Sequence, residues 1–384
     1  MKQLKIPAVF MRGGTSNAVV FNAKDLPRDR ALWDEIFLAA IGSPDPYGRQ
    51  LDGMGGGISS LSKAAVIGPP TRPGADVDYT FAQVAVDRPV VDLGANCGNL
   101  SSAVGPFAVD QGLCPRPDGP ALVRIHNTNT GRLLRASFSV RDGRAETRGE
   151  LAIPGVAGTG APVRLDFLDP GGARTGRLLP TGRPVDEVDL DGAGRFRLSL
   201  VDAANPAVFV AAAELGLDGT ESPDELEARP EVMALLDRLR RRAGVLMGLA
   251  PAPGAVELAN PKIAVLCPPR PFRTLDGRLV AAADHDVGVR MLSMERAHRA
   301  VPVTGALCLG VACRVAGTVA QEVAATPATA GQPLRVGNPS GVVQVAAEVA
   351  GPAGGWRAGS ATLYRTARAL MRGQVAVPAV SDGR

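Results

Sequence analysis

Cys97 is the side chain whose surroundings in this sequence best fit reactive chemistry. It stands between Asn96 and Gly98, ahead of a small-residue stretch that we expect to be helical. The free N–H groups and the positive dipole end of a helix N-terminus lower the pKa of a thiol and favour the thiolate. The same groups bind carboxylate or enolate-like oxygens, with Asn96 and Asn99 as further donors and Gly98 allowing close approach. The alternative is an inert core cysteine.

Lys63 is the second candidate for acid–base chemistry. It follows a serine-rich loop and precedes the apolar run Ala64–Ile67, which we expect to be a strand. A lysine at the mouth of a buried strand loses solvation, its pKa falls, and it can serve as a general base near neutral pH. The alternative is an exposed lysine at a strand end.

Other kinds of site are disfavoured by the motifs. The glycine-rich loop at 53–57 lacks the Gly-Lys-Ser/Thr ending of a phosphate loop, and neither GxGxxG nor GxSxG occurs. The three histidines have no metal-ligand spacing. Five cysteines without CxxC spacing, and no signal-peptide pattern, predict a reduced cytoplasmic protein. The remaining four cysteines lie in apolar contexts and are predicted to be inert: Cys114, Cys267, Cys308 and Cys313.

The composition indicates a globular protein whose modest positive charge would suit an anionic small-molecule substrate. The chain has 384 residues, 45% of them hydrophobic and 21% charged, with a net charge of +4. The run Arg238–Arg242 is interpreted as a solvated helix face, because basic arms and interleaved aromatics are missing, so nucleic acid is disfavoured. The longest apolar run, between Arg299 and Arg314, is too short to span a membrane and predicts a buried helix.

Many short strand-like runs and few helices predict an α+β fold. We expect helices over 28–41, ended by Gly42, and over 222–248, and we expect 362–372 to turn from strand into helix or extended chain. A soft domain boundary is expected within 169–183, a stretch rich in Gly, Pro and Arg. The expected strands cover 6–11, 18–21, 64–67, 79–86, 122–126, 136–140, 163–167 and 262–267.

A weak internal sequence similarity suggests two halves of similar fold. Cys97-Gly98-Asn99-Leu100 with Val104 lines up with Thr304-Gly305-Ala306-Leu307 with Val311. Each segment follows a loop and opens a small-residue, helix-like stretch. We therefore expect two such halves to face each other across a cleft.

The chain resembles the 2-methylaconitate cis-trans isomerase family, called PrpF. The resemblance follows the chain in order from end to end. Its segments are MRGGTS (11–16), GSPDPYGRQLDGMGGGISSLSK (42–63), VDY-F-QVAVD (77–87), NCGNLSSAVGPFA (96–108), PKIAVLCPPR (261–270), SMERAH (293–298), TGA (304–306) and NPSG (338–341).

This resemblance implies a fold and a chemistry. The fold is that of diaminopimelate epimerase: two pseudo-symmetric halves, each a mixed sheet around a central helix, here 1–180 with 365–384 and 181–364. Catalysis needs neither metal nor organic cofactor, and a proton and a double bond shift in an unsaturated tricarboxylate. Lys63 and Cys97 match the catalytic pair. The implied substrate-binding residues are Thr15, Ser16, Asn96, Gly98, Asn99, Arg270, Ser293, His298, Thr304, Gly305 and Ser340.

Several alternatives stay open at this point. The substrate is 2-methylaconitate in the main interpretation, with a 4-oxalomesaconate tautomerase, an aconitate- or methylitaconate-type isomerase and a non-catalytic partner of an aconitase-like dehydratase as alternatives. A two-base racemase is disfavoured because Thr304 replaces a second cysteine. Asn17 and Asn338 depart from the family pattern at positions that can touch the ligand. A role in propionate catabolism, a functional link to an aconitase-like dehydratase and a homodimer are further expectations.

Overall fold

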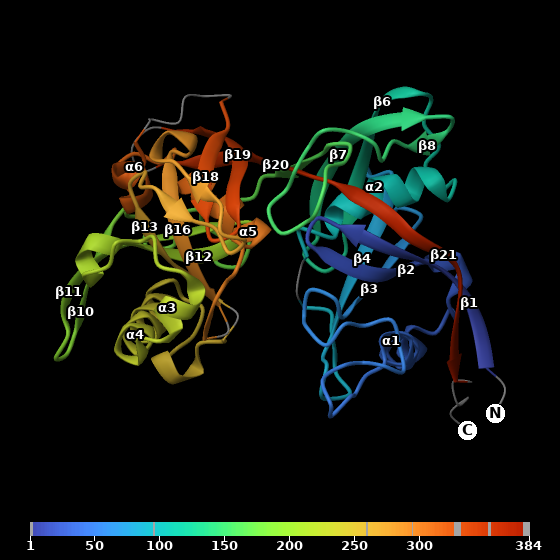
Figure 1. The fold of residues 1–384 in the computed structure, drawn as a ribbon, viewed down its shortest axis with the longest axis horizontal. Helices are drawn as coiled ribbons and strands as arrows, with labels where there is room; N and C mark the ends of the chain where they lie inside the picture. Colours follow the sequence, from blue (N-terminus) through green and yellow to red (C-terminus); the bar gives the residue numbers. More distant parts are fainter. Residues whose placement is uncertain are drawn as a thin grey trace. The chain divides into compact units, whose positions relative to one another are not determined.

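The computed structural model describes residues 3–94, 97–258, 260–293, 295–325, 332–351 and 355–378. The chain forms two compact units, Met1–Asp166 with Tyr364–Arg384 (unit 1) and Phe167–Leu363 (unit 2) (Figure 1). The expected boundary near residue 180 lies inside unit 2. The turn-rich stretch 169–183 belongs there because its backbone is bonded to Asp202: Gly172 N donates to the Asp202 carbonyl, and Arg174 N donates to its carboxylate.

Unit 1 is built on one mixed sheet. Strand β2 pairs with β1 antiparallel and β3 parallel, β4 pairs with β3 antiparallel and β6 parallel, and β7 pairs with β6 antiparallel. The last strand of the chain, β21, pairs with the first, β1. The strands are β1 (Gln3–Gly13), β2 (Ser16–Asn22), β3 (Lys63–Gly68), β4 (Val77–Val84), β5 (Val91–Asp92), β6 (Gly119–Asn127), β7 (Arg132–Arg141), β8 (Arg144–Ala145), β21 (Ala367–Pro378) and β9 (Val163–Leu168), whose last two residues belong to unit 2.

Two helices cover opposite faces of this sheet. Helix α1 (Trp33–Ile41) ends at Gly42, whose φ of 83° is left-handed, and it shares a core cluster with Ala64 and Val66 of β3. Helix α2 (Ser101–Asp110) is buried along almost its whole length and contacts β1, β6, β7, β8 and β21, so the sheet wraps around it (Figure 1). Since side chains alternate along a strand, Lys63 and Ala65 point toward α2.

Unit 2 contains a second mixed sheet with its own central helix. Helix α5 (Val303–Ala312) is buried along almost its whole length and contacts β11, β12 and β19, while α4 (Pro230–Leu246) contacts β10 and β13. The strands are β10 (Asp186–Leu190), β11 (Gly194–Ala203), β12 (Asn205–Ala211), β13 (Lys262–Cys267), β14 (Phe272–Arg273), β15 (Leu279–Val280), β16 (Val287–Ser293), β17 (Arg296–Ala297), β18 (Leu334–Asn338), β19 (Gly341–Ala350) and β20 (Arg357–Arg365), whose last two residues belong to unit 1. The remaining helices are α3 (Pro223–Glu227), α6 (Val319–Val323) and the short 3₁₀ turns η1 (Ala23–Asp25), η2 (Arg30–Leu32), η3 (Ala212–Leu215), η4 (Pro253–Ala255) and η5 (Ala282–Asp284).

The two units repeat one order of pairings. In unit 1 the series β1, β2, β3, β4, β6, β7 pairs antiparallel, parallel, antiparallel, parallel, antiparallel. In unit 2 the series β11, β12, β13, β16, β18, β19 pairs in the same order. The central helix precedes the fifth strand of the series in both units. The predicted α+β fold with two pseudo-symmetric halves around central helices is confirmed.

Of the two forms expected for the tail 362–372, the structure has the extended one, which runs through β20 and β21. One local expectation needs correction. The arginine run of α4 is not wholly solvated. Arg240 is buried because the helix turns this position toward the interior of unit 2, and its guanidinium contacts Asp237 and the Glu257 carbonyl. Within the described residues, no helix is long and apolar enough to cross a membrane.

Candidate active site

Cys97 lies at the entrance to α2. Its Sγ accepts a hydrogen bond from the Leu100 backbone N–H at 3.5 Å and lies 3.8 Å from Ser16 Oγ. Its carbonyl accepts from Ser101 N at 3.1 Å, a helix-type bond across the turn that leads into α2. The sulfur of Cys97 therefore faces a backbone N–H donor just ahead of the N-terminal, positive end of α2.

Lys63 is held inside unit 1 beside Cys97. Its side chain is buried, and Nζ donates to Gln83 Oε1 at 2.9 Å and to the Ser59 carbonyl. Burial lowers the pKa of Lys63, and the charge of Cys97 raises it by a smaller amount. Among the described residues no carboxylate pairs with Lys63, so its Nζ is held by neutral acceptors beside Cys97.

Two residues that the sequence did not single out complete this environment. The Gln83 amide nitrogen donates to the Ser59 and Ser62 carbonyls, which turns Gln83 Oε1 toward Lys63. The Tyr79 side chain is fully buried, and its pKa lies well above the usual value because of burial first and the charge of Cys97 second. Both residues come from β4: the β3–β4 pairing places Gln83 opposite Lys63, whereas Tyr79 lies further along, opposite Ile67.

Asn99 is oriented by a buried arginine. Arg365 Nε donates to Asn99 Oδ1 at 3.0 Å, Nη1 donates to the Tyr364 carbonyl, and burial lowers the pKa of Arg365 to about 10. Gly14 lies against the same amide: a Cβ there would stand 2.3 Å from Asn99 Oδ1, and its φ of 54° is left-handed. The RTAR segment around Arg365 carries no spacing signal, and it lies too far along the chain to be linked to Asn99 by sequence.

The structure thus gathers the unit 1 residues of the predicted site. Ser16, Gly98 and Asn99 lie around Cys97, and Thr15 occupies the turn between β1 and β2 directly before Ser16. Asn96 lies outside the described residues, and so does the side chain of Ser293 in unit 2.

The unit 2 residues gather before and at the start of α5. Thr304 and Gly305 belong to its first turn, and a Cβ at Gly305 would stand 2.3 Å from Met291 Sδ. His298 N donates to the Met291 carbonyl at 2.8 Å, and Ser340 Oγ donates to the Arg299 carbonyl at 2.6 Å. His298, Thr304, Gly305 and Ser340 are therefore neighbours within one unit.

Two further positions singled out in the sequence have partners within unit 2. Arg270 pairs with Asp218 at 3.0 Å and follows Cys267, at the end of β13 opposite to the one where His298 lies. Asn338 is buried, and its amide is used internally: Oδ1 accepts from the backbone N–H groups of Val301 and Ser340, and Nδ2 donates to the Gly341 carbonyl. Asn338 therefore ties β18 to the segment ahead of α5.

The alignment of Cys97 with Thr304 is offset in the structure. At the start of α2, the first carbonyl that accepts a hydrogen bond from the N–H four residues later is that of Cys97. At the start of α5, the first such carbonyl is that of Pro302, which accepts from Ala306 N. Thr304 thus lies two residues further in. Cys308 points elsewhere, as expected: its Sγ donates to the Val201 carbonyl, and burial raises its pKa.

Comparisons with known proteins agree along the whole chain. A family model described as PrpF protein matches residues 3–378. The 3-methylitaconate isomerase of Eubacterium barkeri is 40% identical, and the match covers 98% of each chain. The 2-methyl-aconitate isomerase of Shewanella oneidensis is 37% identical over 98% of each chain. The (4E)-oxalomesaconate Delta-isomerase of a Novosphingobium species is 40% identical over 97% of each chain.

Solved structures show the same relationship. A crystal structure of methylitaconate-delta-isomerase matches at a TM-score of 0.87 and 38% identity and covers 100% of both chains. A hydroxyproline epimerase from Agrobacterium vitis matches at a TM-score of 0.54 and 14% identity, covering 98% of this chain and 94% of that one, which shows a shared fold. With a family model that spans the chain and several isomerases at 37–40% identity, the protein belongs to the PrpF family of isomerases.

Proposed function

We propose that the protein is a cofactor-independent isomerase that moves a proton and a double bond in an unsaturated tricarboxylate, 2-methylaconitate in the first place. The observation that carries this proposal is the buried Lys63 beside Cys97 at the entrance of α2. The 2-methyl-aconitate isomerases among the relatives support the choice of substrate.

Lys63 is the proposed base. An ammonium group cannot accept a proton, so a lysine base must be neutral, and burial lowers the pKa of Lys63 toward that state. The neutral amine removes a proton from the allylic carbon, and the electron pair is delocalised into the adjoining carboxylate. Backbone N–H groups at the start of α2 and the Asn99 amide stabilise the developing oxyanion.

Cys97 is the proposed partner acid. Its thiol donates a proton back to the allyl system, which leaves the double bond in its new position or geometry, a Cys97 thiolate and a Lys63 ammonium. A proton passing from Lys63 to Cys97 restores both groups, so the cycle needs no external reagent. The opposite assignment of base and acid follows the same balance.

Replacing either group tests the mechanism. Cys97→Ser and Lys63→Ala are each expected to lower kcat about 10²-fold or more, because each removes an acid–base group. Lys24→Ala is the matched control, since Lys24 is exposed in η1, and its kcat should stay at the wild-type value. Turnover near the wild-type rate in a folded Cys97 or Lys63 variant removes that residue from the mechanism.

The substrate is tested with a panel of unsaturated tricarboxylates, followed by ultraviolet absorbance and proton NMR in deuterated water. The competing candidates are methylitaconate and 4-oxalomesaconate, because relatives named for them are each 40% identical to this chain. The highest kcat/KM identifies the substrate. Saturable binding without solvent deuterium exchange into any candidate would favour a non-catalytic accessory role instead.

The proposal includes the cellular setting that the family resemblance implies. The enzyme is expected in the cytoplasm, in propionate catabolism, where an aconitase-like dehydratase handles the same tricarboxylates. A homodimer is the expected assembly to test by light scattering.

A further inference from the structure

A second lysine occupies in unit 2 the place that Lys63 has in unit 1. Lys63 is the first residue of β3, and Lys262 is the first residue of β13. Each strand is the third of its series, with a parallel neighbour on one side (β2 or β12) and an antiparallel neighbour on the other (β4 or β16). The fold repeat therefore relates the two lysines.

Because lysine is rare in this protein, the presence of lysine at both equivalent strand positions is informative. Only five of the 42 basic residues are lysines, and all the others are arginines. Arginine keeps its charge when buried, whereas a buried lysine shifts its pKa readily and presents a compact ammonium group. Two of the five lysines stand at equivalent, shielded positions, where the choice of lysine matters chemically.

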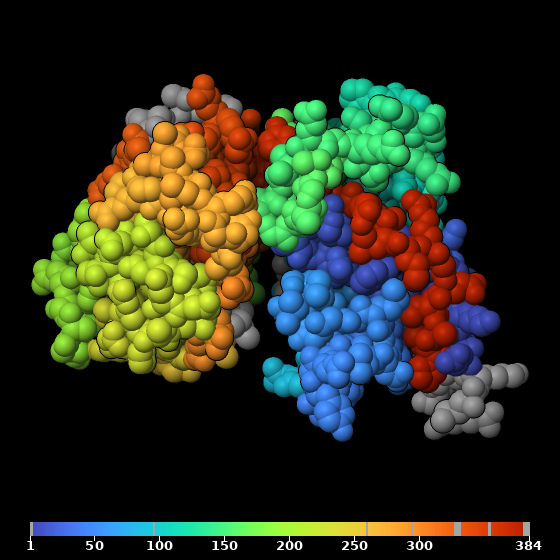
Figure 2. All heavy atoms as spheres, in the orientation of Figure 1, coloured from blue at the N-terminus to red at the C-terminus, as the bar shows by residue number. Residues whose placement is uncertain are grey.

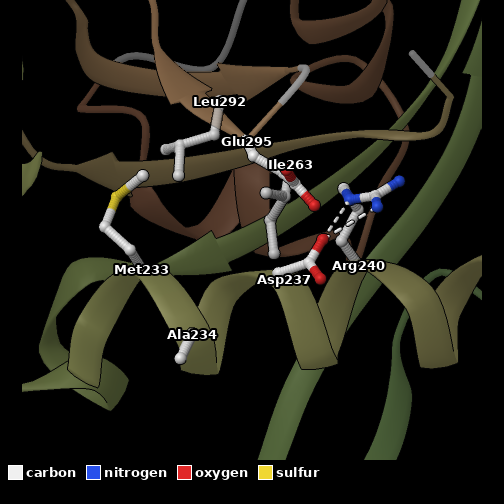
Figure 3. Close-up of a pocket in the computed structure, with 7 residues that line it drawn as sticks. All are labelled: Met233, Ala234, Asp237, Arg240, Ile263, Leu292 and Glu295. Carbon is white, nitrogen blue, oxygen red and sulfur yellow. Dashed lines mark hydrogen bonds and ion pairs between the residues drawn. The ribbon is translucent and has the colours of Figure 1, made fainter. Parts of the chain in front are cut away.

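Lys262 points toward the face of the sheet that carries α5. The opposite face holds Ile263 and Leu292, which line a pocket of about 260 Å³ against Met233 of α4 (Figure 3). Because side chains alternate along a strand, Lys262 and Ala264 face the other way, as does Met291 opposite Ala264. Met291 also packs against the Gly305 backbone in the first turn of α5.

His298 is the titratable neighbour of Lys262. The pKa of His298 is lowered to about 4, by burial first and by the charge of Lys262 second, so the imidazole is neutral near pH 7. Its Nε2 is buried and has no hydrogen-bond partner among the residues that the structure describes. Burial lowers the pKa of Lys262 to about 8, so Lys262 is still mostly an ammonium ion at neutral pH. A neutral imidazole with a free ring nitrogen thus lies beside a cation.

Several charged groups on the elements around Lys262, within the described part of the chain, have partners of their own. Helix α5 and strand β12 contain no charged residue. On β17 and its turn, Glu295 pairs with Arg241 and Arg296 pairs with Glu227. On β16, Arg290 stands opposite Val265, on the face away from α5, and donates to the Glu221 carbonyl. Among the described residues, His298 is a titratable group on which the charge of Lys262 acts.

We propose that Lys262 is a substrate-binding residue whose ammonium group holds one carboxylate of the polycarboxylate substrate, with His298 and the first turn of α5 as its neighbours. The inference rests on the proposed function and adds a cation to the predicted substrate-binding residues of unit 2. A proton-transfer role fits less well, because the position in unit 2 that corresponds to Cys97 is Pro302. The nearest thiol along α5, Cys308, is buried and bonded to the Val201 carbonyl.

The first test separates binding from catalysis. Lys262→Met is expected to raise KM for the tricarboxylate at least about 30-fold with a much smaller change in kcat, because a desolvated carboxylate loses its charged partner. Lys262→Arg keeps the charge and is expected to stay within a few-fold of the wild-type KM at pH 7. Lys24→Met controls for the loss of one positive charge at an exposed site.

The pH dependence provides a signature that a structural role would not give. The wild-type dissociation constant of propane-1,2,3-tricarboxylate, a saturated probe that cannot isomerise, should rise above about pH 8 as Lys262 loses its proton. In Lys262→Arg this rise should move beyond pH 10, because guanidinium keeps its proton there. Calorimetry in buffers of different ionisation enthalpy should detect proton uptake on binding to the wild type at pH 8.5 and a smaller uptake in Lys262→Arg.

The outcomes distinguish this inference from the proposed function. A folded Lys262→Met variant with wild-type KM and probe affinity overturns the role of Lys262 even if turnover of the tricarboxylate is confirmed. Loss of kcat at unchanged KM overturns it as well and assigns Lys262 to proton transfer. Probe binding that depends on Lys262 in a protein that isomerises no tricarboxylate supports the anion site and refutes the proposed reaction.

Discussion

At the scale of single residues, His298 makes the free energy of unfolding depend on pH. Its ring is shielded by unit 2 and lies near the Lys262 ammonium group, and both effects oppose its protonation. In the unfolded chain the ring regains water and its ordinary pKa near 6.5. The folded and unfolded states therefore bind different numbers of protons between about pH 4 and pH 6.5.

Replacing His298 should remove this part of the acid sensitivity. Below pH 6.5 the unfolded state takes up a proton that the native state refuses until about pH 4, so stability falls as the pH is lowered through that range. Between pH 7 and pH 4.5, this effect lowers the free energy of unfolding by about 2–3 kcal/mol. Urea unfolding at pH 7 and pH 4.5 should show a smaller loss of unfolding free energy in His298→Gln than in the wild type. Equal losses in the two proteins would contradict the buried, neutral state of His298.

The candidate residues that the sequence predicted are those whose surroundings are set by neighbouring residues in the chain. Cys97 was identifiable because a helix start follows it within a few residues, and Lys63 because its own strand buries it. Gln83 and Arg365 act through partners 20 and 266 positions away, so their roles depend on strand pairing that no local pattern reveals. Lys262 was missed because only the fold repeat and the scarcity of lysine mark it.

At the scale of elements, the segment Arg12–Gly14 brings a hairpin against the entrance of α2. A Cβ on Gly13 would stand 2.9 Å from Leu100 Cα and 3.0 Å from the Asn99 carbonyl oxygen. Arg12 Nη1 donates to the Gly14 carbonyl and the Thr366 carbonyl, which ties the turn to the start of β21. The two glycines thus allow β1 to touch the turn that holds Cys97.

A methyl group at Gly13 should therefore disturb catalysis as well as stability. Because the obstructing atoms are backbone, Gly13→Ala must push β1 and the turn before α2 apart, at a cost of about 1–3 kcal/mol. We expect a lower melting temperature and a kcat reduced at least about tenfold, because a small displacement of Cys97 misaligns proton transfer. Both quantities are measured on the purified variant by thermal unfolding and steady-state kinetics.

Gly373→Ala is the matched control for this substitution. Gly373 lies on β21, next to β1, and an added Cβ there meets no atom within 4 Å. Its stability and kcat should remain within error of the wild type. Wild-type kcat in Gly13→Ala would show that the close approach of β1 does not position Cys97.

Element boundaries were predicted best where burial and chain-breaking residues coincide. Strand β13 runs over the predicted 262–267, and α1 ends at Gly42 as expected. The tail at 362–372 was ambiguous, since its residues have mixed propensity. Its extended form results from the pairing of β21 with β1, which forms only once unit 1 has folded.

At the scale of the whole molecule, unit 1 is closed by the two ends of the chain. Strands β1 and β21 pair antiparallel from Gln3 with Pro378 to Gly13 with Ala367. Figure 2 shows the red C-terminal segment beside dark-blue N-terminal residues on the surface of this unit. A few matching residues in the sequence indicated that the two halves share a fold. That Thr304 lies two residues beyond the position equivalent to Cys97 appears only when the starts of α2 and α5 are compared.

A substitution in β21 should therefore unfold the unit that carries Lys63 and Cys97. Val377 is fully buried and packs in one core cluster with Ile6, Val19 and Phe37, so Val377→Asp places an unpaired charge among apolar side chains. The expected loss of stability is at least about 3 kcal/mol. Hydrogen–deuterium exchange should show lost protection in β1, α1 and β21, with α4 and α5 of unit 2 less affected.

Ala376→Asp supplies the matched control for Val377→Asp, because Ala376 neighbours Val377 on the same strand but points outward. Surface substitutions of this kind usually change stability by no more than about 0.5 kcal/mol. The same exchange experiment should therefore give a wild-type pattern for Ala376→Asp. If Val377→Asp leaves protection of β1 intact, or if both units lose protection equally, the C-terminal strand is not what closes unit 1, and the two halves unfold as one body.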